Sequence, residues 1–125
     1  MHEMGIANSV MESVRIEAQR FPGRHISKVG VRIGELAGVD PEAMRFCFEA
    51  LVRGSDLEPL ELDIDYRPRR RECQSCGRCF VACPEDLACP KCGGLTSRLI
   101  GGDELELAYL EVEDGACATG TQSLE

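Results

Sequence analysis

The sequence contains little aromatic material from which to build a core. It has no tryptophan, and aromatic residues make up only 5% of the chain. Apolar residues of all kinds reach 43% of the 125 residues, so the core is expected to be aliphatic and modest in size. A chain of this length accommodates one ordinary domain, or a smaller domain with a metal-stabilised module attached.

The sequence also lacks the features of several protein classes. No apolar run approaches the roughly 18 residues that indicate a transmembrane helix. The first residues show no basic segment followed by an apolar one, so a cytoplasmic location without membrane contact is expected. A net charge of −8 opposes general nucleic-acid binding, whose affinity depends on neutralising phosphates. There is no recognisable catalytic constellation or phosphate-binding loop, so the protein is not expected to be an enzyme.

Cysteine, by contrast, is abundant, with eight residues. Two segments, residues 73–77 and 89–93, each read Cys-x-x-Cys-Gly. Each such turn presents two thiolates, and the glycine after the second cysteine permits a positive φ. A tetrahedral divalent metal needs four soft donors, so the two segments predict a structural zinc site, with iron in the same cage as the alternative. The predicted ligands are Cys73, Cys76, Cys89 and Cys92.

The remaining cysteines are not expected to bind this metal. Cys79 and Cys83 lie between the two segments, but neither is followed by glycine. A labile disulfide or a second metal site is the alternative role for this pair. Cys47 falls on the apolar stripe of a predicted helix and is expected to pack in the core. Cys117 lies in the tail, where the sequence predicts no role for it.

Hydrophobic periodicity predicts an α+β fold. Apolar residues at a three-four spacing indicate helices, and strict alternation indicates strands. The predicted helices cover residues 4–21 and 41–53, and the predicted strands cover residues 26–34, 60–66 and 105–112. Asp40 is expected to cap the second helix. The elements predict two helices packed on a three-stranded sheet, in which the acidic face of the second strand meets Lys28 and Arg32.

The cysteine segments are expected to form an insertion in this fold. A basic run at residues 67–71, read as solvated linker or as a patch for an acidic partner, marks the change in composition. The predicted organisation is an α/β domain formed by residues 1–67 and 100–113, a zinc-ribbon-like four-cysteine module at residues 68–99, and a disordered tail at residues 114–125.

His2 makes the N-terminus a second candidate metal site. The Met1 amine, the His2 amide and the His2 imidazole can close two adjoining chelate rings, and planar nitrogen sets of this kind suit Ni(II) or Cu(II). The Glu3 amide or a carboxylate would supply a fourth donor. The competing interpretation is an ordinary loose chain end. His25 follows a turn and is expected to be an exposed polar residue.

Several segments occur in an order that resembles one protein family. They are residues 1–4 (MHEM), 32–42 (RIGELAGVDPE), 46–49 (FCFE), the two cysteine segments, and residues 101–105 (GGDEL). Together they resemble the HypA/HybF family of hydrogenase-maturation nickel metallochaperones over residues 1–113. The resemblance implies a nickel-binding α/β domain joined to a zinc domain. It places Met1, His2 and Glu3 at nickel and the four segment cysteines at zinc.

The same resemblance implies the partners, which are a nickel-handling GTPase and the [NiFe]-hydrogenase large-subunit precursor. Some family members add a histidine from the zinc module to the nickel site, but the second histidine of this chain is His25, outside that module. Two rival functions remain. A zinc ribbon with the basic run at 67–71 would bind nucleic acid or a transcription partner. A redox protein would use Cys79 and Cys83, although no thioredoxin-like βαβ pattern surrounds them.

Overall fold

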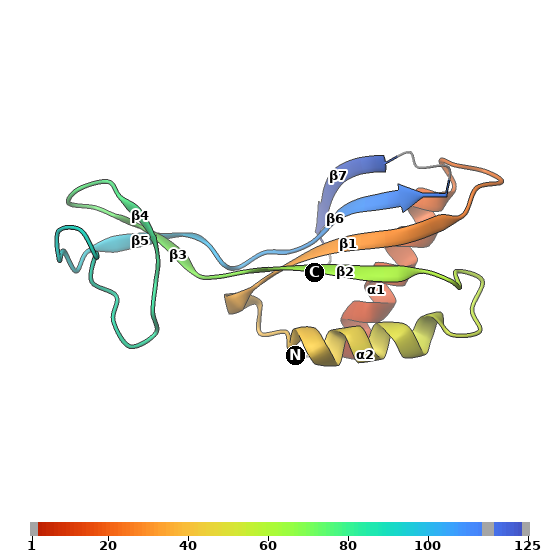
Figure 1. Ribbon diagram of the computed structural model, residues 1–125, viewed down its shortest axis with the longest axis horizontal. Coiled ribbons are helices and arrows are strands. Elements are labelled where there is room, and N and C mark those ends of the chain that lie inside the picture. Colours follow the sequence, from red (N-terminus) through yellow and green to blue (C-terminus); the bar gives the residue numbers. More distant parts are fainter. Residues whose placement is uncertain (1–2, 114–116, 124–125) are drawn as a thin grey trace.

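The computed structural model describes residues 3–113 and the backbone of residues 117–123 (Figure 1). The elements in chain order are α1 (Glu3–Ala18), β1 (Ile26–Gly34), the 3₁₀ helix η1 (Glu35–Ala37), α2 (Pro41–Val52), β2 (Glu61–Arg67), β3 (Arg70–Cys73), β4 (Cys79–Val81), β5 (Ser97–Gly101), β6 (Leu105–Val112) and β7 (Cys117–Ser123). The strands form two sheets, of order β2-β1-β6-β7 and β4-β3-β5. Figure 1 shows both helices beside the larger sheet, with the smaller sheet extending away from it.

The larger sheet confirms the predicted α+β class. β1 and β2 run parallel and are connected through α2, whereas β1 and β6 are antiparallel. The sheet has four strands where the sequence predicts three, because β7 pairs with the outer edge of β6.

β7 also corrects the prediction of a disordered tail. The backbone of residues 117–123 is extended and pairs antiparallel with β6. An edge strand such as β6 presents a row of backbone donors and acceptors that an adjacent extended segment can satisfy, whatever its composition. The rest of the predicted tail, residues 114–116 and 124–125, lies outside the described residues.

The two helices pack on one face of the larger sheet for reasons visible in their sequences. α1 buries Ile6, Val10 and Val14 along one stripe, and the chain turns at Gly23, which has a φ of 79°. α2 begins at Pro41 and buries Met44 and other residues of its apolar stripe. Within the described part of the chain, neither helix is long and apolar enough to cross a membrane.

The opposite face of the sheet carries ion pairs. Lys28 Nζ lies 3.7 Å from a carboxylate oxygen of Glu61 on β2, and the Arg32 guanidinium reaches Asp65 at 3.4 Å and Glu106 at 2.9 Å. These contacts confirm that the acidic face of β2 meets Lys28 and Arg32. Pairs this exposed contribute only about 0–1 kcal/mol each, so the stability of the domain comes from the helix-covered face.

Candidate metal centre

Two tight turns of the smaller sheet supply the cysteines of the candidate centre. One turn follows β3 and carries Cys73 and Cys76, and its Gly77 N–H donates to the Cys73 carbonyl at 3.0 Å. The other turn precedes β5, and its Gly93 N–H donates to the Cys89 carbonyl at 2.8 Å. Gly77 and Gly93 have φ values of 79° and 75°. The glycines therefore occupy the left-handed conformation that the sequence predicts for them.

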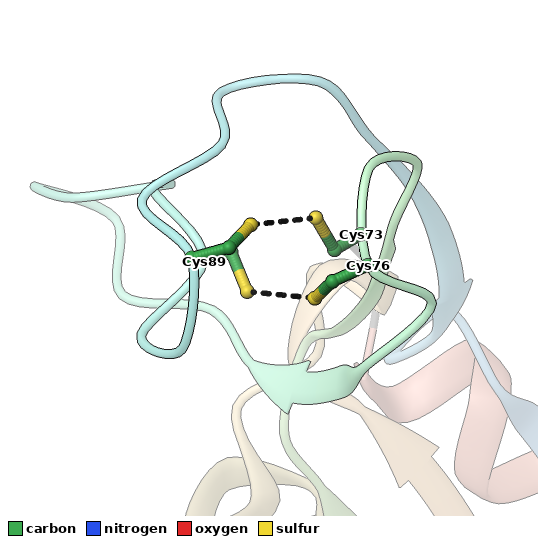
Figure 2. A group of neighbouring side chains, drawn as sticks. Cys73, Cys76 and Cys89 are labelled. Carbon is green, nitrogen blue, oxygen red and sulfur yellow. Dashed lines mark hydrogen bonds between the residues drawn. The ribbon is translucent and has the colours of Figure 1, made fainter.

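The turns bring the four predicted zinc ligands to one point. The sulfur atoms of Cys73, Cys76, Cys89 and Cys92 all lie within 4.8 Å of one another. Figure 2 shows Cys73 and Cys76 on one side of the group, facing Cys89 on the other. The Cys73–Cys92 and Cys76–Cys89 sulfur pairs are each 3.6 Å apart. Thiolates bound tetrahedrally at 2.3 Å to one zinc ion are about 3.8 Å apart, so this donor set fits such an ion.

Backbone donors favour the thiolate form in this centre. The N–H groups of Cys76 and Ser75 point at the Cys73 sulfur and lower the pKa of that thiol to about 6 against the opposing effect of burial. The backbone N–H of Gly94 lowers the pKa of Cys92, but sharing a proton with Cys73 outweighs it and raises that pKa to about 11. Without metal the pair therefore retains one proton at neutral pH, and a bound cation displaces it.

The centre takes the place of a conventional core in the module. Cys73 and Cys89 are buried, and the only other buried members of their cluster are Phe80 and Ala82. Cys76 is exposed. Four residues bury too little surface to hold a chain segment in place, so a metal bound by the four cysteines would supply most of the folding free energy of the module.

The other cysteines lie outside this group. Cys79 and Cys83 are exposed, and neither joins the four clustered sulfurs. The Cys83 thiol donates to a Glu85 carboxylate oxygen at 3.1 Å, and that hydrogen bond raises the pKa of the thiol. Cys47 on α2 is half-buried against the core of the larger domain, as its place on the apolar stripe predicts.

The N-terminal candidate site is only partly described. Met1 and His2 lie outside the described residues, whereas Glu3 begins α1. The Asp40 backbone N–H donates to the Glu3 carboxylate at 3.3 Å, which holds the start of α1 against the start of α2. The Asp40 side chain accepts the Glu42 N–H at 3.0 Å, so it caps α2 as predicted.

His25 lies far from both candidate sites along the chain and forms a structural contact. Its Nε2 atom is 2.6 Å from the Pro59 carbonyl oxygen. The side chain is half-buried, whereas the sequence predicts an exposed one, because the loop before β2 folds over it.

Comparison with known proteins assigns the family. The model of a family described as "Hydrogenase/urease nickel incorporation, metallochaperone, hypA" matches residues 1–112. This chain belongs to the HypA family. The hydrogenase maturation factor HypA of Geobacter metallireducens is 43% identical over 113 residues, which cover 90% of this chain and 100% of the relative. The HypA of Streptomyces avermitilis is 38% identical over 117 residues, which cover 92% of this chain and 89% of the relative.

Solved structures agree with the HypA assignment. The solution structure of the nickel metallochaperone HypA from Helicobacter pylori aligns with a TM-score of 0.59 at 27% identity, covering 89% of this chain and 97% of that one. A second HypA solution structure aligns with a TM-score of 0.64 at 26% identity, covering 90% and 97%. The relatives are named as maturation factors and, in one solved structure, as a nickel metallochaperone, and neither name denotes an enzyme.

Proposed function

We propose that this HypA-family protein binds Ni(II) at its N-terminus and delivers it to the [NiFe]-hydrogenase large-subunit precursor together with a nickel-handling GTPase. The observation that carries the proposal is the family match over residues 1–112, which includes the chelating sequence Met1-His2-Glu3. The Met1 amine and the His2 amide and imidazole would hold the ion. A site on a chain end is open, and a carrier needs such openness because it must release its cargo.

We assign zinc, as a structural ion, to the four cysteines of the centre. Four protein thiolates leave no free coordination position, which is typical of structural rather than catalytic or transfer sites. Tetrahedral sulfur ligation favours zinc, whereas Ni(II) favours planar nitrogen and oxygen ligands. The two candidate sites therefore differ in chemistry in the way that separate structural and cargo ions require.

The basic run at residues 67–71 gives little support to the rival nucleic-acid function. Arg69 contacts Glu35 and Arg71 donates to Ser97, so two of these side chains are engaged within the protein. A net charge of −8 also opposes binding to a polyanion. The protein is therefore proposed to work without nucleic acid or membrane, and a gel-shift assay showing sub-micromolar binding at physiological salt would reverse this assignment.

Isothermal titration with Ni(II) tests the cargo site in three proteins. The first has Met1 as a free N-terminus, the second carries His2→Ala, and the third is extended by two residues before Met1. The chelate needs the amine and the imidazole together, so both altered proteins should lose specific Ni(II) binding while retaining their zinc. Affinity should also fall with pH, because protons compete for the imidazole and amine, with reference pKa values of about 6.5 and 7.7–8.0.

The control is Met4→Leu, an exposed position on the first turn of α1, which should bind Ni(II) like the unaltered protein. Equal affinity in the free, His2→Ala and extended proteins would contradict the N-terminal site. Loss of zinc from His2→Ala would instead indicate that the two metal sites are not separate.

A further inference from the structure

The module joins the α/β domain through two chain segments, and η1 lies against both of them. The outgoing segment, residues 68–69, follows β2. One Glu35 carboxylate oxygen accepts the Arg69 backbone N–H at 2.8 Å. The other oxygen lies 3.9 Å from the Arg69 guanidinium. The Glu35 and Arg69 side chains are only 30% and 23% exposed, so solvent screens this contact incompletely.

The returning segment, residues 102–104, is held by backbone N–H groups at the junction of β1 and η1. The Leu36 N–H donates to the Gly102 carbonyl at 2.6 Å, and the Gly34 N–H donates to the Glu104 carbonyl at 2.7 Å. A Cβ atom on Gly34 would lie 2.2 Å from the Gly102 oxygen, and one on Gly102 would lie 2.7 Å from Arg69 Cα. Three stretches of backbone therefore meet here, with no room for a side chain at Gly34 or Gly102.

Arg69 forms backbone hydrogen bonds to both the domain and the module. Its N–H is bound by Glu35, and its carbonyl accepts the Ala82 N–H at 2.9 Å, just after β4. The Arg69 Nε atom is buried and has no hydrogen-bond partner among the described residues. The backbone of Arg69, more than its guanidinium, thus links the domain to the module.

The chain that follows η1 reaches the start of α1. From Glu35 the chain continues through the buried Val39 to Asp40, whose N–H is bound by the Glu3 carboxylate. The short segment 35–40 therefore contacts the root of the module at one end and the start of α1 at the other. Figure 1 shows the start of α2 at the end of the domain from which the module extends.

We propose that Glu35 is a positioning residue, which clamps the root of the four-cysteine module and so fixes its orientation relative to the start of α1, which Met1 and His2 precede in the sequence. The biological role of this clamp rests on the proposed function, because a fixed orientation would present the cargo site and the module to a partner in one arrangement. The clamp itself is formed by a carboxylate on one backbone N–H, and it does not require nickel.

Residual dipolar couplings of the zinc-loaded full-length protein test the clamp. In the unaltered protein, amides of the domain and of the module should fit one alignment tensor. In Glu35→Ala the Arg69 N–H loses its acceptor, so the module should lose the shared alignment and show weaker couplings than the domain. Glu35→Gln keeps a neutral acceptor and should show a smaller loss. Arg69→Gln keeps the backbone N–H and should show the smallest loss.

The matched control is Glu42→Gln, which removes the same charge from an exposed position on the first turn of α2. It should leave the shared alignment intact. A module that stays aligned with the domain in Glu35→Ala would overturn the proposal. If Glu35→Ala does not fold, the Glu35→Gln protein is the test. Unchanged alignment of the module in Glu35→Gln would then show that Glu35 acts only on stability, which would likewise overturn the proposal.

Ni(II) titration of the same proteins separates this proposal from the cargo site. If the domain and the module of the unaltered protein share one alignment tensor but the protein does not bind Ni(II), the N-terminal nickel site is refuted and the clamp is not. If the Glu35→Ala protein binds Ni(II) like the unaltered protein and its module stays aligned with the domain, the clamp is refuted and the nickel site is not.

Discussion

The two parts of the molecule are held together by different forces. The α/β domain buries twenty residues in one cluster, drawn from both helices, the larger sheet and the loops between them. The module has a cluster of four buried residues, and two of these are cysteines of the metal centre. Burial stabilises the first part in proportion to the apolar area removed from water. The second part has too little such area and depends on a metal ion.

The two parts also differ in charge. Residues 68–99 contain six of the fourteen basic residues and only three of the twenty-two acidic ones. The remaining chain therefore carries eight basic residues against nineteen acidic ones. The net charge of −8 is therefore the sum of a strongly acidic domain and a basic module. An acidic domain attracts a divalent cation, so the proposed cargo site lies on the half whose field favours it.

The largest expected effect comes from removing one cysteine of the centre. Cys73→Ala should release the metal and unfold the module, because structural zinc sites contribute apparent free energies of about 10–16 kcal/mol. The α/β domain should remain folded. Elemental analysis reports the zinc, and amide spectra of β1 and β6 against those of β3 and β5 report the two parts separately.

Cys79→Ser is the matched control, since Cys79 lies in the same module outside the sulfur group. It should keep its zinc and its module spectrum. Undiminished zinc in Cys73→Ala, or zinc loss in Cys79→Ser, would show that the ligands are wrongly assigned.

Lowering the pH should destabilise the module before it destabilises the α/β domain. In the metal-free centre the pKa of the Cys73 thiol is lowered from 9.0 to about 6, so protons compete with a metal for this sulfur increasingly as the pH falls towards that value. Protonation competes with the metal, so zinc loss to a chelator should accelerate as the pH falls from 7 to 5. Helical circular dichroism should change little over this range. Loss of helix at or above the pH of zinc release would contradict the separation of the two parts.

A core substitution should produce the opposite pattern. Phe48→Ala removes the largest fully buried side chain of the α/β domain and should cost about 3–5 kcal/mol in the free energy of unfolding, measured in urea. The zinc-loaded module should show no loss of metal in native conditions. Phe46→Ala, on the same helix but 72% exposed, should change the unfolding free energy by less than about 0.5 kcal/mol. Equal effects from the two variants would show that α2 does not pack as described.

The smallest expected effect is on the cap of α2. Asp40→Ala removes the acceptor for the Glu42 N–H and should cost about 1 kcal/mol of domain stability. Asp40→Asn retains an acceptor and should cost less. The same urea measurement applies, and a cost in Asp40→Asn as large as in Asp40→Ala would exclude capping as the role of the side chain.

Features that depend on neighbouring residues could be predicted from the sequence. The cysteine turns with their glycines, the Asp40-Pro41 start of α2 and the alternation of β2 are all local patterns, and the structure contains each of them. The convergence of four cysteines was also predictable, because a metal requires four donors from two such turns.

Features that depend on distant residues could not be predicted. β7 exists through pairing with β6, and its Thr- and Gly-containing sequence carries no apolar alternation that would mark it. Glu35 meets Arg69 across 34 positions of sequence, and a lone glutamate in a loop gives no sign of such a partner. The Gly101-Gly102 pair was the one available signal that backbones approach closely at this junction.

The contact between Arg69 and Gly102 has a consequence for the metal-free chain. It closes a loop whose two ends are already held together by the folded domain. For a flexible loop the entropic cost of closure grows only with the logarithm of its length, about 0.6 kcal/mol for each doubling. Without its metal, the unfolded module is therefore a long surface loop, and closing this loop costs the folded domain little conformational entropy. We therefore expect newly made chains to fold the α/β domain first, with the module becoming ordered later, when its metal binds.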